Sequence, residues 1–260
     1  MDTYKGFADV YDRMMDNIPY EEWGDYIISL LQQKGIMPGA HILELGCGTG
    51  SICLRLSRAG YHMTGLDLSG EMLAVAEKKT KGEPIVYSKQ DMTSFYFEEM
   101  FDAAISVCDS MNYLLEEEQF YNTLYRVKEH LKEGGCFLFD VKTPYFYEKV
   151  CGDQVFAEDQ EDYSYIWDNC YDEKQKIHEY AVTIFEKLPE NGYYQKFTEF
   201  HYQRAYEQKE LKQMLLATGF QNVKLYRAFT DKKAGKRDER WYAVAEQEIT
   251  ENKAKEGKQS

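Results

Sequence analysis

The sequence has little of what marks exported, membrane-bound or metal-dependent proteins. No run approaches the ~18 apolar residues of a membrane-spanning helix, and the first residues lack the basic and apolar pattern of a signal peptide. The six cysteines form no C-x-x-C pair and no Cys/His cluster at metal-ligand spacing, which suits a reducing compartment. We therefore expect a cytoplasmic protein with no metal site and no membrane contact.

Positive charge is also scarce, because 31 Lys and Arg stand against 45 Asp and Glu, a formal net charge of −14. Such a surface repels phosphate backbones, so we expect no long nucleic acid as a partner. The charge does not exclude a small anionic ligand bound by a few arginines. The length of 260 residues suits one domain with an insertion and leaves monomer and homodimer open.

The most informative stretch runs from Ile42 to Gly50 and reads I-L-E-L-G-C-G-T-G, a buried strand followed by a glycine loop and a helix start. Glycine removes Cβ where the backbone turns tightly or approaches a ligand, and the helix directs unpaired N–H groups to the same place. Asp67 ends a second apolar strand about 20 residues later, where open α/β sheets hold the hydroxyls of a ribose. Together these features predict a ligand that contains a nucleoside.

The glycine spacing separates the candidate ligands. Gly46, Gly48 and Gly50 give G-x-G-x-G, whereas dinucleotide sites use G-x-G-x-x-G. The loop resembles motif I of the class I S-adenosylmethionine-dependent methyltransferases. Four further segments match later motifs of this family in the family's order, at residues 65–69, 90–92, 101–109 and 131–140. The chain is similar to the small-molecule members of the family.

The resemblance implies an α/β fold with a Rossmann-like, doubly wound sheet of seven strands, mostly parallel with the last strand antiparallel. Alternating strands and helices from residue 20 to residue 141 also predict a parallel sheet covered on both faces. One of these helices, residues 116–131, is expected to close at the glycine pair 134–135. Residues 163–169, 177–185 and 196–204 alternate in period two, which predicts an antiparallel insert of about three strands.

The expected organisation has four parts. Residues 1–19 form an N-terminal lid segment, because Tyr4, Phe7, Ala8, Tyr11 and Asp12 resemble the Tyr-x-x-x-Ala-x-x-Tyr-Asp segment of small-molecule methyltransferases. Residues 20–145 and 207–246 form the methyltransferase core, residues 146–206 form the insert that covers the substrate, and residues 247–260 form a disordered tail.

The resemblance implies S-adenosylmethionine as the cofactor and assigns its contacts. Glu44 and the glycine loop face the methionine end, Asp67 accepts hydrogen bonds from the ribose, and Asp91 accepts one from the adenine amine. The alternatives are a helix cap for Asp67, a turn for Asp91, backbone pairing for Glu44 and a helix face for the N-terminal tyrosines. The implied cofactor-binding residues are Tyr4, Tyr11, Glu44, Gly46, Cys47, Gly48, Gly50, Asp67, Leu68, Met72, Gln90, Asp91, Met92 and Cys108.

Methyl transfer is an in-line displacement at a carbon that the sulfonium already activates, so alignment and water exclusion matter more than acid–base groups. His201 is the candidate base, since a histidine pKa can lie near 7, and Asp109 is a second candidate catalytic residue. The alternatives are a purely structural histidine, an Arg204 that pairs with surface carboxylates, and insert aromatics that only reflect the preference of strands for such residues. The candidate substrate-binding residues are Asn112, Tyr113, Trp167, Glu199 and Arg204.

These features predict a methyltransferase that acts on N or O of a small metabolite. Residues 109–112 stand where amino-methylating nucleic-acid enzymes of the family carry the motif Asn/Asp-Pro-Pro-aromatic. This chain reads Asp-Ser-Met-Asn there, which excludes the clamp that those enzymes use for a planar amine. One alternative is an RNA or protein methyltransferase, for which Lys232, Lys233, Lys236 and Arg237 form the obvious basic cluster. Another is a non-catalytic S-adenosylmethionine-binding protein. The acceptor, its reacting atom and the pathway are not readable from the sequence.

Overall fold

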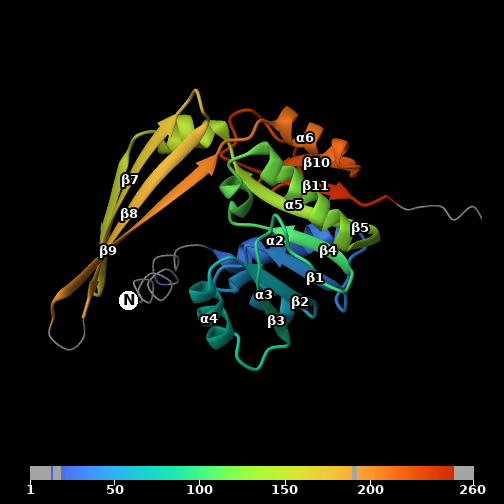
Figure 1. Cartoon of the computed structure of the whole chain (residues 1–260), viewed down its shortest axis with the longest axis horizontal. Helices are drawn as coiled ribbons and strands as arrows, with labels where there is room; N and C mark the ends of the chain where they lie inside the picture. Colours follow the sequence, from blue (N-terminus) through green and yellow to red (C-terminus); the bar gives the residue numbers. More distant parts are fainter. Residues whose placement is uncertain (1–12, 14–18, 189–191, 249–260) are drawn as a thin grey trace, which may run out of the picture.

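A computed structural model describes residue 13, residues 19–188 and residues 192–248 of the chain. These residues form a larger mixed sheet covered by helices and a second, separate sheet that runs beside it (Figure 1). The elements in chain order are α2 (Tyr20–Gln33), β1 (His41–Leu45), α3 (Ser51–Arg58), β2 (His62–Asp67), α4 (Gly70–Lys79), β3 (Ile85–Lys89), β4 (Phe101–Ser106), η1 (Ser110–Tyr113), α5 (Glu117–His130), β5 (Leu131–Lys142), η2 (Phe146–Cys151), β6 (Val155–Asp159), β7 (Tyr163–Asp172), β8 (Ile177–Lys187), β9 (Tyr194–Arg204), α6 (Gln208–Ala217), β10 (Gln221–Arg227) and β11 (Arg240–Glu246).

The larger sheet has seven strands in the order β10-β11-β5-β4-β1-β2-β3. Strands β1 to β5 pair in parallel, and β11 is antiparallel to both β5 and β10. This arrangement confirms the expected Rossmann-like sheet with an antiparallel last strand. In such a sheet the parallel strands end at one common edge, where ligands bind.

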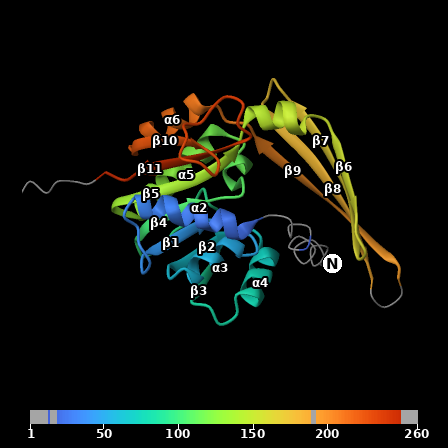
Figure 2. The ribbon, with the colours of Figure 1, turned by 180° about the vertical axis from the view of Figure 1, so that it is seen from behind.

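Apolar residues on both faces of the sheet explain why helices cover it from two sides. In β1, Ile42 packs with Ile27 of α2 and Leu56 of α3 on one face. Leu43 packs on the other face in the same cluster as Phe120 of α5 and residues of α6. A strand buried on both sides reads as a continuous apolar run, which is why this strand was recognisable in the sequence. Figure 2 shows the same layers from behind.

The predicted reason for the end of helix α5 is wrong. Helix α5 ends at His130 and β5 begins at the next residue, so the glycine pair 134–135 lies inside the strand and does not close the helix. A Cβ on Gly135 would lie 2.9 Å from the carbonyl oxygens of Asp102 and Lys132. The register between β4 and β5 shifts in this region, so the glycines allow a bulge with close backbone contact.

The second sheet is antiparallel with the order β6-β7-β8-β9, one strand more than expected. Strand β6 was missed because it has only five residues and is mostly exposed, so it lacks the clear alternation of the other three. On β9 the alternation was read correctly. Glu199, His201 and Gln203 lie on the more buried face, while Phe200 and Tyr202 are exposed.

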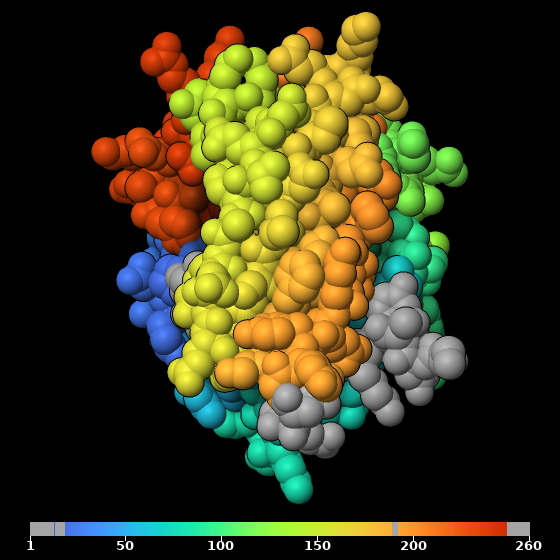
Figure 3. All heavy atoms as spheres, turned by 90° about the vertical axis from the view of Figure 1, so that its left-hand side faces the viewer, coloured from blue at the N-terminus to red at the C-terminus, as the bar shows by residue number. Residues whose placement is uncertain are grey.

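The insert sheet follows β5 through η2 and returns to the core through α6. In Figure 3 it runs down the middle of one side of the molecule, with parts of the core visible on both sides of it. Near its far end, Arg13 forms an ion pair of 2.5 Å with Glu186 of β8, and the Tyr163 hydroxyl donates to the Arg13 carbonyl at 3.2 Å. Tyr4 and Tyr11 lie outside the described residues, as does the chain after residue 248.

Candidate functional site

The glycine loop between β1 and α3 is shaped by backbone that only glycine adopts easily. Gly46, Gly48 and Gly50 have φ values of 67°, 52° and 73°. A Cβ on Gly46 would lie 2.7 Å from Ser110, whereas a Cβ on Gly48 would meet nothing within 4 Å. The loop is therefore packed from below at its first glycine and open above its second, which is the form of a ligand cradle.

Asp67 at the end of β2 connects this loop to the start of α4. Its two carboxylate oxygens accept hydrogen bonds of 2.8 Å from the backbone N–H groups of Gly48 and Ser69. Burial raises its pKa, and the backbone hydrogen bonds oppose that rise. Each carboxylate oxygen has two acceptor positions, so the side chain can still accept two hydrogen bonds from a ligand. The helix cap itself is Ser69, whose hydroxyl accepts from Met72.

Glu44 lies under the loop with only 3% of its surface exposed. Burial raises its pKa to about 8, and its Oε2 atom is buried without a hydrogen-bond partner among the described residues. A buried carboxyl oxygen with no partner is costly, so a cation or donor that reaches it would be bound favourably. The Cys47 side chain points away from the cradle, because a Cβ on Gly65 would lie 2.8 Å from its sulfur. Cys47 can therefore serve a ligand only through its backbone.

Comparison with known proteins identifies the family. Residues 42–135 match the family described as "Methyltransferase domain". The chain is 38% identical over 252 residues to a relative named as methyltransferase YqeM of Bacillus subtilis (strain 168), with 95% of this chain and 98% of that one covered. A relative from Geobacillus sp. (strain WCH70), also named as a methyltransferase, is 37% identical over 246 residues, with 94% and 99% covered.

The crystal structure of an S-adenosylmethionine-dependent methyltransferase from Clostridium acetobutylicum ATCC 824 superposes with a TM-score of 0.84 at 28% identity, and 94% of this chain and 99% of that one are covered. The chain belongs to the S-adenosylmethionine-dependent methyltransferases. The methyltransferase uses S-adenosylmethionine, as the motif series implied.

The cradle fits this cofactor. The open space above Gly48 admits a ligand against the backbone, the unpartnered Glu44 oxygen suits an ammonium group, and Asp67 retains acceptor positions for two hydroxyls. When bound there, S-adenosylmethionine supplies a methyl group on a positively charged sulfur.

The residues expected around adenine are only partly available. Oδ1 of Asp91 accepts from the backbone N–H and the hydroxyl of Thr93, both at 2.8 Å, so the turn alternative is realised while Oδ2 has no bond in the described residues. The Gln90 side chain, which was expected to bind the cofactor, is engaged within the protein. Its oxygen accepts from the Tyr96 N–H at 2.9 Å, and its nitrogen donates to the Tyr96 carbonyl at 3.2 Å. Leu68 is 67% exposed, and Met72 and Met92 are half-buried, which leaves apolar surface for a ligand.

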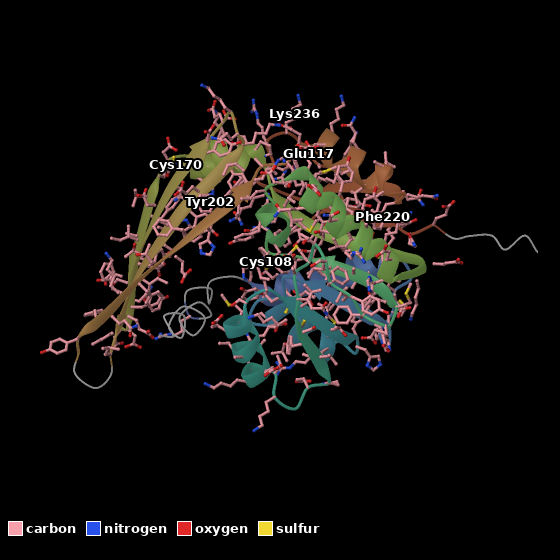
Figure 4. All side chains as sticks on the ribbon, in the orientation of Figure 1. Cys108, Glu117, Cys170, Tyr202, Phe220 and Lys236 are labelled. Atoms are coloured by element: carbon pink, nitrogen blue, oxygen red, sulfur yellow. The ribbon has the colours of Figure 1, made fainter. Side chains whose placement is uncertain are left out.

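Cys108 and Asp109 connect β4 to η1 at the edge that faces the insert (Figure 4). Both have positive φ, 60° and 58°, a conformation that strains ordinary residues. The Asp109 carboxylate lies 3.2 Å from Lys142 Nζ and 2.9 Å from an Arg240 nitrogen, and the Gln203 amide donates to it at 2.8 Å. Arg240 also pairs with the fully buried Asp140.

This network argues against Asp109 as a catalytic base. Burial opposes its ionisation, but the Lys142 and Arg240 cations outweigh that effect and lower its pKa. Both of its carboxylate oxygens are already engaged by these cations and by the Gln203 amide. The network instead attaches the insert to the core, since Gln203 belongs to β9. The sequence did not reveal Arg240 or Lys142 because they come from β11 and β5, far from Asp109 in the chain.

Two candidate substrate residues are occupied within the protein. The Asn112 amide donates to the carbonyls of Lys142 and Arg204 at 3.2 and 2.8 Å, and its oxygen accepts from the Lys142 N–H at 2.9 Å. Arg204 pairs with Glu210 at 2.6 Å and donates to the Leu115 carbonyl at 3.1 Å. Asn112 is fully buried. Both side chains thus help to join the insert to the core, and their place in the substrate site stays a prediction.

Tyr113 brings the core into contact with the inner face of the insert. Its hydroxyl lies 2.7 Å from the Tyr180 hydroxyl and 3.1 Å from Nδ1 of His201. Removal of its hydroxyl from water raises the pKa of Tyr113, and the Asp109 and Asp67 carboxylates raise it further, while 41% of the residue's surface is exposed. His201 stacks on Tyr180 at 4.7 Å between ring centroids. Burial, with a smaller contribution from Lys142, lowers the pKa of His201, so its ring is neutral at pH 7.

A cavity of about 300 Å³ lies beyond the Asp109 network, between η2 and the loop from β10 to β11. Its lining includes Lys142 and Arg240 from the network, together with Phe146, Phe229 and Arg237.

Among the described residues no helix is long and apolar enough to cross a membrane.

Proposed function

We propose that the methyltransferase transfers a methyl group to N or O of a small metabolite. The observation that carries this proposal is the contact of Tyr113 with Tyr180 and His201, because it sets an aromatic face of the insert opposite the cofactor cradle. We place a small acceptor between these two surfaces, whereas a long polymer would need an open groove. The proposed division keeps residues 20–145 and 207–246 as the core and 146–206 as the substrate cover.

Two more distant relatives support a small acceptor. The chain is 25% identical over 232 residues to the glycine/sarcosine N-methyltransferase of Aphanothece halophytica, with 87% of this chain and 83% of that one covered. It shares its fold with the sugar N-methyltransferase KedS8 from Streptoalloteichus sp. ATCC 53650, at a TM-score of 0.74 and 18% identity. Both names describe methylation of small molecules at nitrogen.

Each wall of the proposed site has a separate task. Asp67, Glu44 and the glycine loop bind and orient the cofactor. Tyr113 and Tyr180 exclude water and align the acceptor, and their hydroxyls can hold its polar atom. His201, which is neutral at pH 7, can accept a proton from the acceptor through its ring. The proposal places no metal in this site.

Labelled S-adenosylmethionine tests the proposal. Purified protein incubated with it and a fractionated lysate should pass label to the small-molecule fraction and leave RNA and protein at background. Asp67→Ala removes the acceptor of two charge-assisted hydrogen bonds, so calorimetry should show cofactor affinity reduced about 100-fold or more. Gly48→Val should act similarly, because valine is strained at φ 52° and its side chain enters the cradle.

Asp168→Ala is the matched control, because Asp168 is exposed on the insert. It should leave cofactor affinity unchanged. Label that enters only RNA or protein would refute a small-metabolite acceptor, and unchanged affinity in Asp67→Ala would refute the cradle.

A further inference from the structure

The strand register arranges the inner face of the insert in rows. Trp167 of β7, Val182 of β8 and Glu199 of β9 lie directly opposite one another in one row. Tyr180 and His201 lie opposite each other in the next row toward the core. Glu199 is therefore the neighbour of His201 on the same strand face, on the side away from the Asp109 network.

Glu199 is a half-buried carboxylate without a counter-ion. Among the described residues it forms no ion pair and no side-chain hydrogen bond. Burial raises its pKa, and the Glu71 carboxylate of α4 raises it further. The Glu71 carboxylate is thus close enough to act on Glu199, and among the described residues neither an ion pair nor a hydrogen bond neutralises Glu199. Two such carboxylates make this part of the site unfavourable for anions and favourable for cations.

The rings beside Glu199 have the geometry that favours an organic cation. Trp167 and Tyr180 lie with ring centroids 5.1 Å apart, and Tyr180 stacks in turn on His201. The Trp167 indole Nε1 is buried and has no hydrogen-bond partner in the part of the chain that the structure describes. Aromatic faces attract ammonium groups, and an indole N–H with no acceptor is a second unsatisfied group that a polar ligand would satisfy.

We propose that the methyl acceptor is an amine, which enters as an ammonium ion and is held by the Glu199 carboxylate beside the half-buried Trp167 ring. This inference rests on the proposed function and narrows its acceptor from N or O to N. An acidic acceptor would be repelled by Glu71 and Glu199, and a neutral alcohol would gain nothing from them. Glu199 thus selects the substrate class, and His201 lies next to it to take a proton.

The reaction balances with these groups. An ammonium nitrogen has no lone pair, so one N–H bond first breaks and its proton moves to the neutral His201 ring. The nitrogen lone pair then forms the N–CH3 bond while the C–S bond breaks, and the sulfur keeps that electron pair as a neutral thioether. The methylated ammonium product carries the positive charge that the sulfonium lost.

Tetramethylammonium is a suitable probe, with the neutral alcohol 2,2-dimethylpropan-1-ol of similar shape as its control. Indole 15N–1H signals report binding, because the chain has three Trp residues. In the presence of S-adenosylhomocysteine, tetramethylammonium should shift the Trp167 signal and bind at least about fivefold more tightly than the alcohol. Trp23 and Trp241, which lie outside the insert, should not shift.

Glu199→Gln keeps the shape of the side chain and removes its charge. It should weaken tetramethylammonium binding about fivefold or more and leave S-adenosylhomocysteine affinity unchanged. Glu179→Gln is the matched control, because Glu179 lies on the outer face of β8, opposite the exposed Tyr202. It should bind the probe like the wild type.

The possible outcomes separate this inference from the proposed function. Equal binding of cation and alcohol, or an unchanged affinity in Glu199→Gln, overturns the amine acceptor. Label that passes from S-adenosylmethionine to hydroxyl compounds alone overturns it too, while the small-metabolite methyltransferase stands. A protein that does not bind S-adenosylhomocysteine at all would remove the proposed function and this inference together.

Discussion

Among single residues, remaining hydrogen-bonding capacity separates the groups that can serve a ligand from those that hold the protein together. Asp67 keeps acceptor positions after pairing with two backbone N–H groups, and Glu44 keeps an oxygen with no partner. The side-chain oxygens of Gln90 and Asn112 already accept hydrogen bonds from backbone groups of neighbouring segments. Sequence patterns place all four at the same edge of the sheet but do not show which bonds are already made.

Asn112→Ala should therefore affect stability and not cofactor binding. The substitution removes hydrogen bonds to the Lys142 and Arg204 backbone and leaves those buried groups unsatisfied, at a cost of about 3 kcal/mol. Urea unfolding measures the loss, and S-adenosylhomocysteine affinity of the folded variant should stay within about twofold of wild type. A variant with normal stability and weakened acceptor binding would instead return Asn112 to the substrate site.

At the scale of elements, local patterns predicted the parallel core and failed where contacts are distant. Strand β1 and the glycine loop follow from a continuous apolar run and glycine spacing, and β9 follows from its alternation. Strand β6 carries no such pattern, since edge strands need little burial. The network that joins the insert to the core brings Asp109 together with Arg240, 131 positions away, a pairing that no local pattern reveals.

The packing of η2 against β8 makes insert stability sensitive to acid. His178 is 2% exposed and packs against the rings of Tyr147 and Tyr180, with centroids 4.9 and 5.4 Å away. Burial, with the Lys142 charge, lowers its pKa to about 4, against 6.5 in the unfolded chain, while Asp109 and Asp153 oppose the shift. Between pH 4 and pH 6.5 the unfolded state therefore binds more protons than the folded state. The stability gained by burying the neutral His178 ring is thus fully present above pH 6.5 and is lost as the pH falls toward 4.

The loss amounts to roughly 3 kcal/mol across that window. His178→Phe keeps a ring in the stack and cannot be protonated, so its unfolding free energy should fall less steeply from pH 6.5 to 4 than that of the wild type. Urea unfolding at several pH values gives both curves. Parallel curves for the two proteins would show that His178 does not titrate in this way.

On the scale of the whole molecule, charge and architecture favour the same kind of acceptor. The insert contacts η1, which follows the end of β4, and its inner side carries aromatic rings and a carboxylate. The surface as a whole has a net charge of −14, which disfavours a polyanion at any distance beyond a local contact. A small cationic acceptor agrees with both observations, and RNA agrees with neither.

The basic cluster in the loop from β10 to β11 offers the test of this argument. Replacing the exposed Lys232, Lys233 and Lys236 by Gln changes the net charge from −14 to −17 and leaves the cradle untouched. Transfer of label from S-adenosylmethionine to the small-molecule fraction should stay within about twofold of wild type, because these lysines would serve phosphate contacts with a polyanion and take no part in the proposed small-acceptor site.

The control for charge alone is the triple change of Lys78, Lys81 and Lys174 to Gln, which removes the same number of exposed cations elsewhere. Both triple variants should label small molecules alike and leave a transfer RNA pool at background. If the wild type labelled that pool, and only the first variant lost this activity at low salt, the loop would be an RNA-binding surface. The acidic surface would then fail as an argument for a small acceptor, because a local cluster would have overcome it.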